Sequence, residues 1–214
     1  MKSTHTIAVI LKNKIGALDT VLPILMDVAS RNPSASIEFH TLHTPTYLAI
    51  KSNYVLWDAV NSIGIIPDHN KGGWLSAKIS KVWMLLRLAV LCLFGRAQII
   101  HFKDLAQWPL RLLYHVSPQR VIYIRDGAYG APASLQKVMY ERKSQHGTHG
   151  PGFFKVNAGN SGLQVFFHRD TLKYTGVALD APFVIMRPPR SLDAWKNFVV
   201  ARAKTDLDSE LAAA

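Results

Sequence analysis

The sequence predicts an α/β fold, a single doubly wound domain with a mainly parallel sheet. Short apolar runs alternate with helical patterns of about 10 to 20 residues, as in βαβ units. The apolar runs have few polar positions, which is typical of strands buried on both faces. No internal repeat or second composition divides the 214 residues. We therefore expect one domain over residues 1–190, with a C-terminal helix and a frayed tail over residues 191–214.

The elements follow from local patterns. In the first helix, Leu18, Val21, Leu22 and Leu25 recur at helical spacing. Strands are predicted at residues 6–11, 36–41, 64–66, 98–102, 120–124, 163–167 and 182–186. Helices are predicted at residues 17–31, 46–63, about 75–94, 104–115, 134–143, 169–174 and 192–203. Residues 146–162 contain five glycines and a proline, so we expect a long loop there.

The net charge of +11, from 25 basic and 14 acidic residues, predicts an anionic partner. Residues 71–126 hold nine Lys or Arg and two Asp, a surplus of seven in this part of the chain alone. The basic residues do not form short runs, and no nucleic-acid-binding motif accompanies them. We therefore expect no nucleic-acid partner.

The most apolar stretch, residues 82–95, lies inside this basic region and contains one charge, Arg87. It is shorter than the roughly 20 apolar residues that cross a bilayer. Two readings stay open: a core helix packed on the sheet, or a helix lying at a membrane surface. In the second reading Lys78, Lys81, Trp83 and Arg87 contact the membrane, because tryptophan and lysine favour its interface.

A ligand site is expected at the carboxyl ends of the strands, where ligands bind in open parallel sheets. Polar and cationic residues suited to phosphate or sugar hydroxyls follow several strands. The substrate-binding candidates are Lys12, Asn13, Lys14, Gly16, Lys103, Asp104, Arg125, Asp126, Arg187 and Arg190. His101 and His146 are the candidates for a catalytic base, which needs one imidazole beside a substrate hydroxyl.

Several site classes are excluded or disfavoured. The turn at residues 12–16 has one glycine where a dinucleotide fingerprint has three, and no Walker A or G-x-S-x-G motif is present. The single cysteine, Cys92, excludes an internal disulfide and a cysteine-based zinc site. His146 and His149 have metal-ligand character without an indicated third ligand, so we expect no metal. The apolar run before Lys12 is too short for a signal-peptide core, which favours a cytoplasmic location.

Three stretches carry a family resemblance. They are the turn at 12–16 with the helix that follows, the apolar helix with the strand at 97–103, and residues 186–195. Residues 145–148 also resemble a W-H-G-T segment of glycerol-phosphate polymerases, without its tryptophan. Together these stretches resemble the N-terminal, acceptor-side domain of GT-B glycosyltransferases, particularly bacterial enzymes of capsule and cell-envelope polysaccharide synthesis.

The resemblance implies that the chain is half of a two-domain enzyme. It would bind an anionic, lipid-linked or polysaccharide acceptor at the inner face of the cytoplasmic membrane. The nucleotide-sugar donor would bind a second domain or subunit, so no cofactor is expected in this chain. Two alternatives stay open: a non-catalytic Rossmann-like subunit that recruits a catalytic partner to an anionic membrane, and a small α/β enzyme acting on a phosphorylated substrate.

Overall fold

The computed structural model describes residues 5–11, 15–41, 43–67, 74–93, 97–101, 117–124, 162–167 and 182–213. These residues form a seven-stranded sheet in the order β3-β2-β1-β4-β5-β6-β7, in which every neighbouring pair is parallel. The strands are β1 (Thr6–Leu11), β2 (Ser36–Thr41), β3 (Gly64–Ile65), β4 (Gln98–His101), β5 (Val121–Ile124), β6 (Leu163–Phe166) and β7 (Phe183–Ile185). The predicted α/β, Rossmann-like fold is confirmed.

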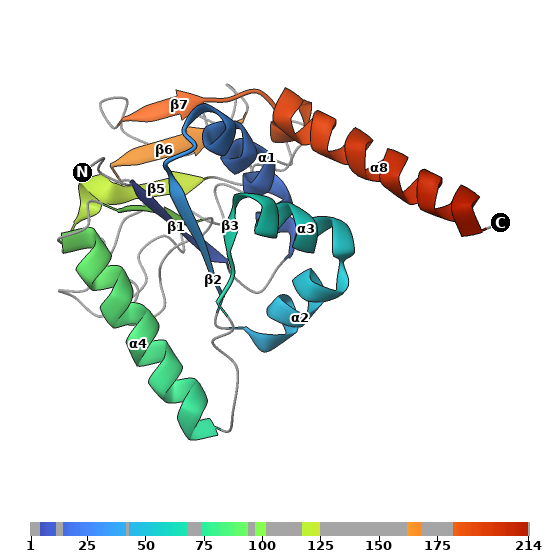
Figure 1. Cartoon of the computed structure of the whole chain (residues 1–214). Coiled ribbons are helices and arrows are strands. Elements are labelled where there is room, and N and C mark those ends of the chain that lie inside the picture. The colour runs from blue at the N-terminus through green and yellow to red at the C-terminus, as the bar shows by residue number, and fades with distance from the viewer. Residues whose placement is uncertain are drawn as a thin grey trace, which may run out of the picture.

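The described helices cover both faces of the sheet (Figure 1). On one face lie α1 (Ile15–Arg31), α2 (Thr44–Ser52) and α3 (Tyr54–Ile63). On the other lies α4 (Trp74–Leu93). The last helix, α8 (Asp193–Ala213), packs across α1 and α3 and then extends past them (Figure 1). Two short 3-10 turns, Pro118–Arg120 and Pro189–Ser191, precede β5 and α8.

Alternate residues of β1, β4 and β5 contribute to two separate apolar clusters, one on each face of the sheet. Val9, Phe39 and Ile100 belong to the larger cluster, on the α1 face, with Leu22 of α1. The smaller cluster joins Met84 and Leu88 of α4 to the other face; its strand residues are Ala8, Ile10, Ile99 and Val121. Each fully buried side chain of this size stabilises the fold by about 1.5–3 kcal/mol. The central strand β1 is therefore buried on both faces, which explains why its sequence is almost continuously apolar.

The single helix predicted over residues 46–63 is wrong, because the chain forms two helices joined at Asn53. The backbone N–H of Asn53 donates to the carbonyl of Ile50 at the end of α2. Its side-chain oxygen accepts from the N–H of Leu56 in the first turn of α3, at 3.1 Å. One asparagine thus caps two helix ends, and asparagine is among the best N-cap residues.

The predicted end of the last helix at residue 203 is also wrong, since α8 continues to Ala213. Arg202 in the middle of the helix binds Asp58 of α3 at 2.7 Å and Asp206 one turn later at 3.3 Å. These contacts fix the helix beyond the predicted end at residue 203. The following residues include alanine, leucine and glutamate, which have high helix propensity. The helices predicted at 104–115, 134–143 and 169–174, and the loop at 146–161, lie outside the described residues.

Candidate functional site

The position where the strand order reverses lies between β1 and β4. From β1 the chain proceeds to β2 and β3 on one side, whereas β4 to β7 continue on the other. In open α/β sheets, ligands bind at the carboxyl end of the sheet at such a position. Leu11 and His101 are the last residues of the two adjacent strands. The predicted catalytic residue His101 therefore stands at the edge of the sheet where a ligand is expected.

A row of polar side chains crosses the α4 face of the sheet at this level. Ile10 of β1 is in register with His40 of β2 and with His101 of β4. His101 is in turn paired with Tyr123 of β5, and Tyr123 with Gln164 of β6. Residues paired between parallel strands project to the same face. Four polar residues on four strands thus lie in one line, interrupted only by Ile10.

Three of the four residues in this polar row are buried. His40, His101 and Gln164 have no more than 1% of their surface exposed. The rings of His101 and Tyr123 stack with their centroids 4.9 Å apart and an interplanar angle of 27°. The imidazole of His101 is thus held inside the sheet face, without solvent contact. Its role as a catalytic base stays a prediction, and it would require the ring to become accessible to a substrate hydroxyl.

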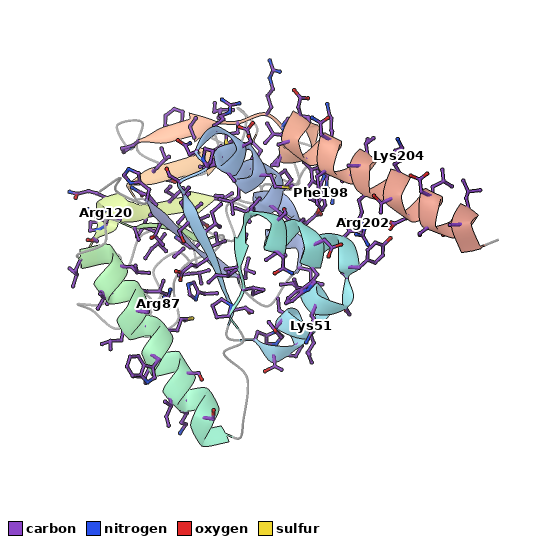
Figure 2. The ribbon with its side chains drawn as sticks, viewed as in Figure 1. Lys51, Arg87, Arg120, Phe198, Arg202 and Lys204 are labelled. Atoms are coloured by element: carbon purple, nitrogen blue, oxygen red, sulfur yellow. The ribbon has the colours of Figure 1, made fainter. Side chains whose placement is uncertain are left out.

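A charged cluster beside the row was not anticipated from the sequence. Glu38 of β2 is 5% exposed, and its Oε1 accepts a hydrogen bond from Nη2 of Arg87 on α4 at 2.6 Å. Its Oε2 lies 3.3 Å from Nε2 of His40. Figure 2 labels Arg87 on the ribbon of α4. The alternation of Glu38 and His40 in an apolar strand was the available signal, because buried charges require partners.

The neighbours of Glu38 favour its ionised form. The hydrogen-bonding contact with His40 lowers the pKa of Glu38 most, burial opposes this, and Arg87 lowers it further, to about 2. Glu38 is therefore a carboxylate over the physiological range. The arrangement is an ion pair that joins α4 to β2.

On the opposite face of the sheet, α1, α3 and α8 surround an open pocket of about 390 Å³. Its lining comprises Ile15, Gly16, Asp19, Asn53, Val55, Leu56 and Trp195. Gly16, a predicted substrate-binding residue, is thus in the pocket wall. Arg190, another predicted residue, forms an ion pair with the lining residue Asp19. The structure therefore brings two of the sequence candidates to one place.

Of the remaining substrate-binding candidates, Arg187 is exposed in the segment after β7 and has no described interaction that joins it to this pocket. The others lie outside the described residues: Lys12, Asn13, Lys14, Lys103, Asp104, Arg125, Asp126 and the second catalytic candidate His146. Their predicted roles stay predictions. Within the described ranges, no group of three His, Cys, Asp or Glu side chains is arranged to hold a metal ion.

The outer side of α4 carries an apolar stripe. Its members recur every three or four residues, and each has about half or more of its surface exposed. They are Ile79, Val82, Trp83, Leu86, Val90 and Leu93. Met84 and Leu88 face the sheet instead and are buried. The core reading is therefore confirmed for one side of the helix. The other side is an exposed apolar surface, and its contact with a membrane stays a prediction.

The cations predicted to contact a membrane are distributed around this stripe. Lys78 is exposed one turn before Val82. Arg87 is 54% exposed while its Nη2 binds Glu38. Lys81 lies in α4, but its side chain is outside what the structure describes. Over the described helices, none has the length and low charge needed to span a bilayer.

Comparisons with known proteins identify no relative. No protein-family model matches the chain, and neither a curated protein nor a solved structure does. The resemblance to GT-B acceptor domains therefore stays a prediction.

Proposed function

We propose that the chain is the acceptor-binding half of a membrane-associated glycosyltransferase. It would hold a lipid-linked or polysaccharide acceptor while a sugar is transferred from a nucleotide-sugar bound by a separate domain or subunit. The observation that carries the proposal is the exposed apolar stripe of α4, on a parallel α/β domain whose strand order reverses between β1 and β4. The exposed apolar stripe supports association with a membrane. The reversal of strand order supports ligand binding, because ligands of open α/β sheets bind at such a position.

The chemistry of α4 suits the surface of an anionic bilayer. Trp83 is the most exposed member of the stripe, at 66%, and an indole ring favours the boundary between headgroups and acyl chains. Lys78 stands beside the stripe, where an ammonium group meets anionic headgroups. The stripe would enter the acyl boundary while Met84 and Leu88 keep the helix attached to the sheet. A lipid-linked acceptor would then reach the domain from the same membrane.

Liposome co-sedimentation tests this proposal. The full chain is expected to sediment with vesicles of phosphatidylglycerol and phosphatidylcholine. Trp83→Asp is expected to reduce binding about tenfold, because a carboxylate resists the acyl boundary. Val200→Asp is the matched control, since Val200 is 68% exposed on α8, away from the stripe. Wild-type protein that stays in solution at low salt, or equal binding by both variants, would overturn the proposal.

Substitutions of two lysines test the electrostatic contribution to membrane binding. Reversing Lys78 and Lys81 to Glu is expected to weaken binding about fivefold or more for each lysine, because a cation near an anionic surface contributes about 1 kcal/mol. Raising the salt concentration should weaken wild-type binding and leave the double variant less affected. Equal salt dependence in both proteins would contradict this part.

The acceptor role is separable from the membrane role. Alone, the chain is expected to bind an acceptor but not to turn over a nucleotide-sugar, since the donor would bind elsewhere. Sugar transfer by the purified chain, measured with radiolabelled UDP-sugars and membrane lipid extract, would contradict the half-enzyme proposal. Membrane binding with no acceptor binding would favour the alternative, a non-catalytic subunit that recruits a partner to the membrane.

A further inference from the structure

The pocket between α1, α3 and α8 has the composition of a small-molecule site. Its volume of about 390 Å³ falls within the roughly 300–1,000 Å³ of ligand pockets. Ile15, Val55 and Leu56 give it apolar walls, while Asp19 and Asn53 contribute polar groups. Mostly apolar walls with few polar groups are usual where a ligand must be oriented as well as bound. The chemical class of the ligand follows from these polar groups and from Trp195.

The charges at the pocket cancel. Asp19 is the acidic residue in the described lining, and its carboxylate forms an ion pair with Arg190. No cationic side chain belongs to that described lining. A phosphate or carboxylate ligand would therefore meet a carboxylate whose own cation is already engaged. A neutral ligand with hydroxyl groups fits better, because a hydroxyl both donates to a carboxylate and accepts from a guanidinium.

Asn53 adds a second hydrogen-bonding group. Its side-chain oxygen accepts from the N–H of Leu56, and this bond fixes the side chain at the start of α3. The amide nitrogen carries two N–H donors, so the fixed side chain can present a donor to a ligand oxygen. Asp19 and Asn53 come from different helices, α1 and the α2–α3 junction. The pocket lining thus contains a hydrogen-bond acceptor on α1 and a donor at the α2–α3 junction.

Trp195, in the first turn of α8, supplies a flat apolar surface. Its ring stacks on that of Phe198 with centroids 5.9 Å apart and an interplanar angle of 23°. Both side chains are partly buried against the large core cluster. An indole held in this way offers a rigid face at low conformational cost. The C–H face of a pyranose ring is flat and apolar, whereas the edge of the ring carries hydroxyls.

We propose that this pocket binds a neutral sugar ring, with one apolar face against Trp195 and hydroxyls directed to Asp19 and Asn53. The inference rests on the proposed function and deepens it, because it assigns the pocket to a sugar of a polysaccharide acceptor, whose chain extends beyond the side on which α4 would meet the membrane. Its location supports this, since α1 begins after the carboxyl end of β1, beside the reversal of strand order. A sugar bound here would lie on the α1 face of the sheet, whereas α4 lies on the other face.

Nuclear magnetic resonance tests the inference without a membrane. The full chain, labelled with ¹⁵N-tryptophan, has five indole N–H signals, and Trp195→Phe assigns the one of interest. The probes are methyl glycosides of neutral hexoses and N-acetylhexosamines, with glucose 1-phosphate as the anionic comparison. Neutral glycosides are expected to shift the Trp195 signal in a saturable way and to leave the Trp83 signal in place. Failure of every neutral glycoside, or a response to glucose 1-phosphate alone, would overturn the inference.

Two variants test the assigned hydrogen bonds while preserving the fold. Asp19→Ala removes the carboxylate acceptor, and Asn53→Ser keeps a capping oxygen for α3 while it removes the amide donor. Each is expected to weaken glycoside binding about five- to tenfold, as for the loss of one hydrogen bond. Lys204→Met, on the far side of α8, is the control and should bind as the wild type does (Figure 2). Unchanged affinity in both pocket variants would overturn the assignment. Because these readouts need no vesicles, sugar binding can fail while membrane binding persists, and the reverse.

Discussion

The guanidinium of Arg87 on α4 donates to the carboxylate of Glu38 on β2, with Nη2 and Oε1 2.6 Å apart. The side chain of Glu38 is nearly fully buried, whereas about half of the Arg87 side chain is exposed. Met84 and Leu88 also attach α4 to the sheet through the smaller apolar cluster, with Leu85 packed against it. The ion pair therefore contributes to the position of a helix that has an apolar surface on its outer side.

Arg87→Met is expected to lower the free energy of unfolding by about 1–2 kcal/mol. This value lies between those for exposed ion pairs and for buried ones, because one partner is exposed and the other is buried. Methionine retains much of the apolar stem of arginine, so the decrease in the free energy of unfolding reflects mainly the removal of the charge. Urea unfolding followed by circular dichroism measures it. Lys204→Met, at an exposed position on α8, should leave the midpoint unchanged, and an equal midpoint for Arg87→Met would contradict the role of the pair.

Stability should fall in acid because of Glu38. Its pKa in the folded protein is about 2, below the ordinary value of 4.5. The ionised form is therefore favoured by folding, and its contribution is complete above pH 4.5 and is lost as the pH falls towards 2. The shift corresponds to at most about 3 kcal/mol. Urea midpoints measured from pH 7 to pH 2 should show a steeper acid decline for wild type than for Glu38→Gln. Parallel declines would show that other carboxylates control acid unfolding.

Two glycines are expected to respond to alanine in opposite directions. A Cβ on Gly64 would lie 2.4 Å from the carbonyl oxygen of Ile37, so Gly64→Ala should force β3 away from β2 and cost about 1–3 kcal/mol. A Cβ on Gly16 meets no atom within 4 Å, and this residue lies in the first turn of α1. Gly16→Ala should stabilise the protein by about 0.5–1 kcal/mol, through helix propensity and a less flexible unfolded chain. Thermal unfolding measures both, and destabilisation by Gly16→Ala would contradict the open space described there.

Arg202 joins α8 to α3, because it binds Asp58 and lies over the ring of Tyr54, with its Cζ 5.1 Å from the ring centroid. Figure 2 shows Arg202 on the side of α8 that faces α3. A double-mutant cycle with Arg202→Ala and Asp58→Ala should give a coupling free energy of about 0.5–1 kcal/mol, because both side chains are about one-third exposed. Additive effects would show that the two residues do not stabilise each other. Arg202→Ala paired with Lys51→Ala, on α2, is the uncoupled control.

Local patterns in the sequence were sufficient for most of the framework. The limits of β1 and β2 were predicted to the residue, and those of β4 to β7 within one residue at each end. The reason is physical: a strand buried on both faces must be apolar throughout, and its ends are marked by polar residues. The apolar residues of α4 similarly predicted a helix between about 75 and 94, close to Trp74–Leu93.

The wrongly predicted helix limits are the junction of α2 with α3 and the end of α8. Both depend on hydrogen bonds or ion pairs whose partners an apolar pattern does not identify. Asn53 ends α2 and begins α3 through two bonds within a few residues, whereas the apolar pattern continues through both helices. Arg202 of α8 binds Asp58 of α3, which lies 144 positions earlier in the chain. Periodicity describes one face of a helix and contains no information on such distant contacts.

By itself, the sequence determined the α/β class, the order of the described elements and the apolar character of α4, because these follow from the burial requirements of each segment. Only the tertiary structure decided that His40, His101, Tyr123 and Gln164 share one row, that Arg87 pairs with Glu38, and that Gly16, Asp19 and Trp195 line one pocket. Each of these relationships joins segments far apart in the chain. They depend on strand register and helix packing, and local propensity does not specify either.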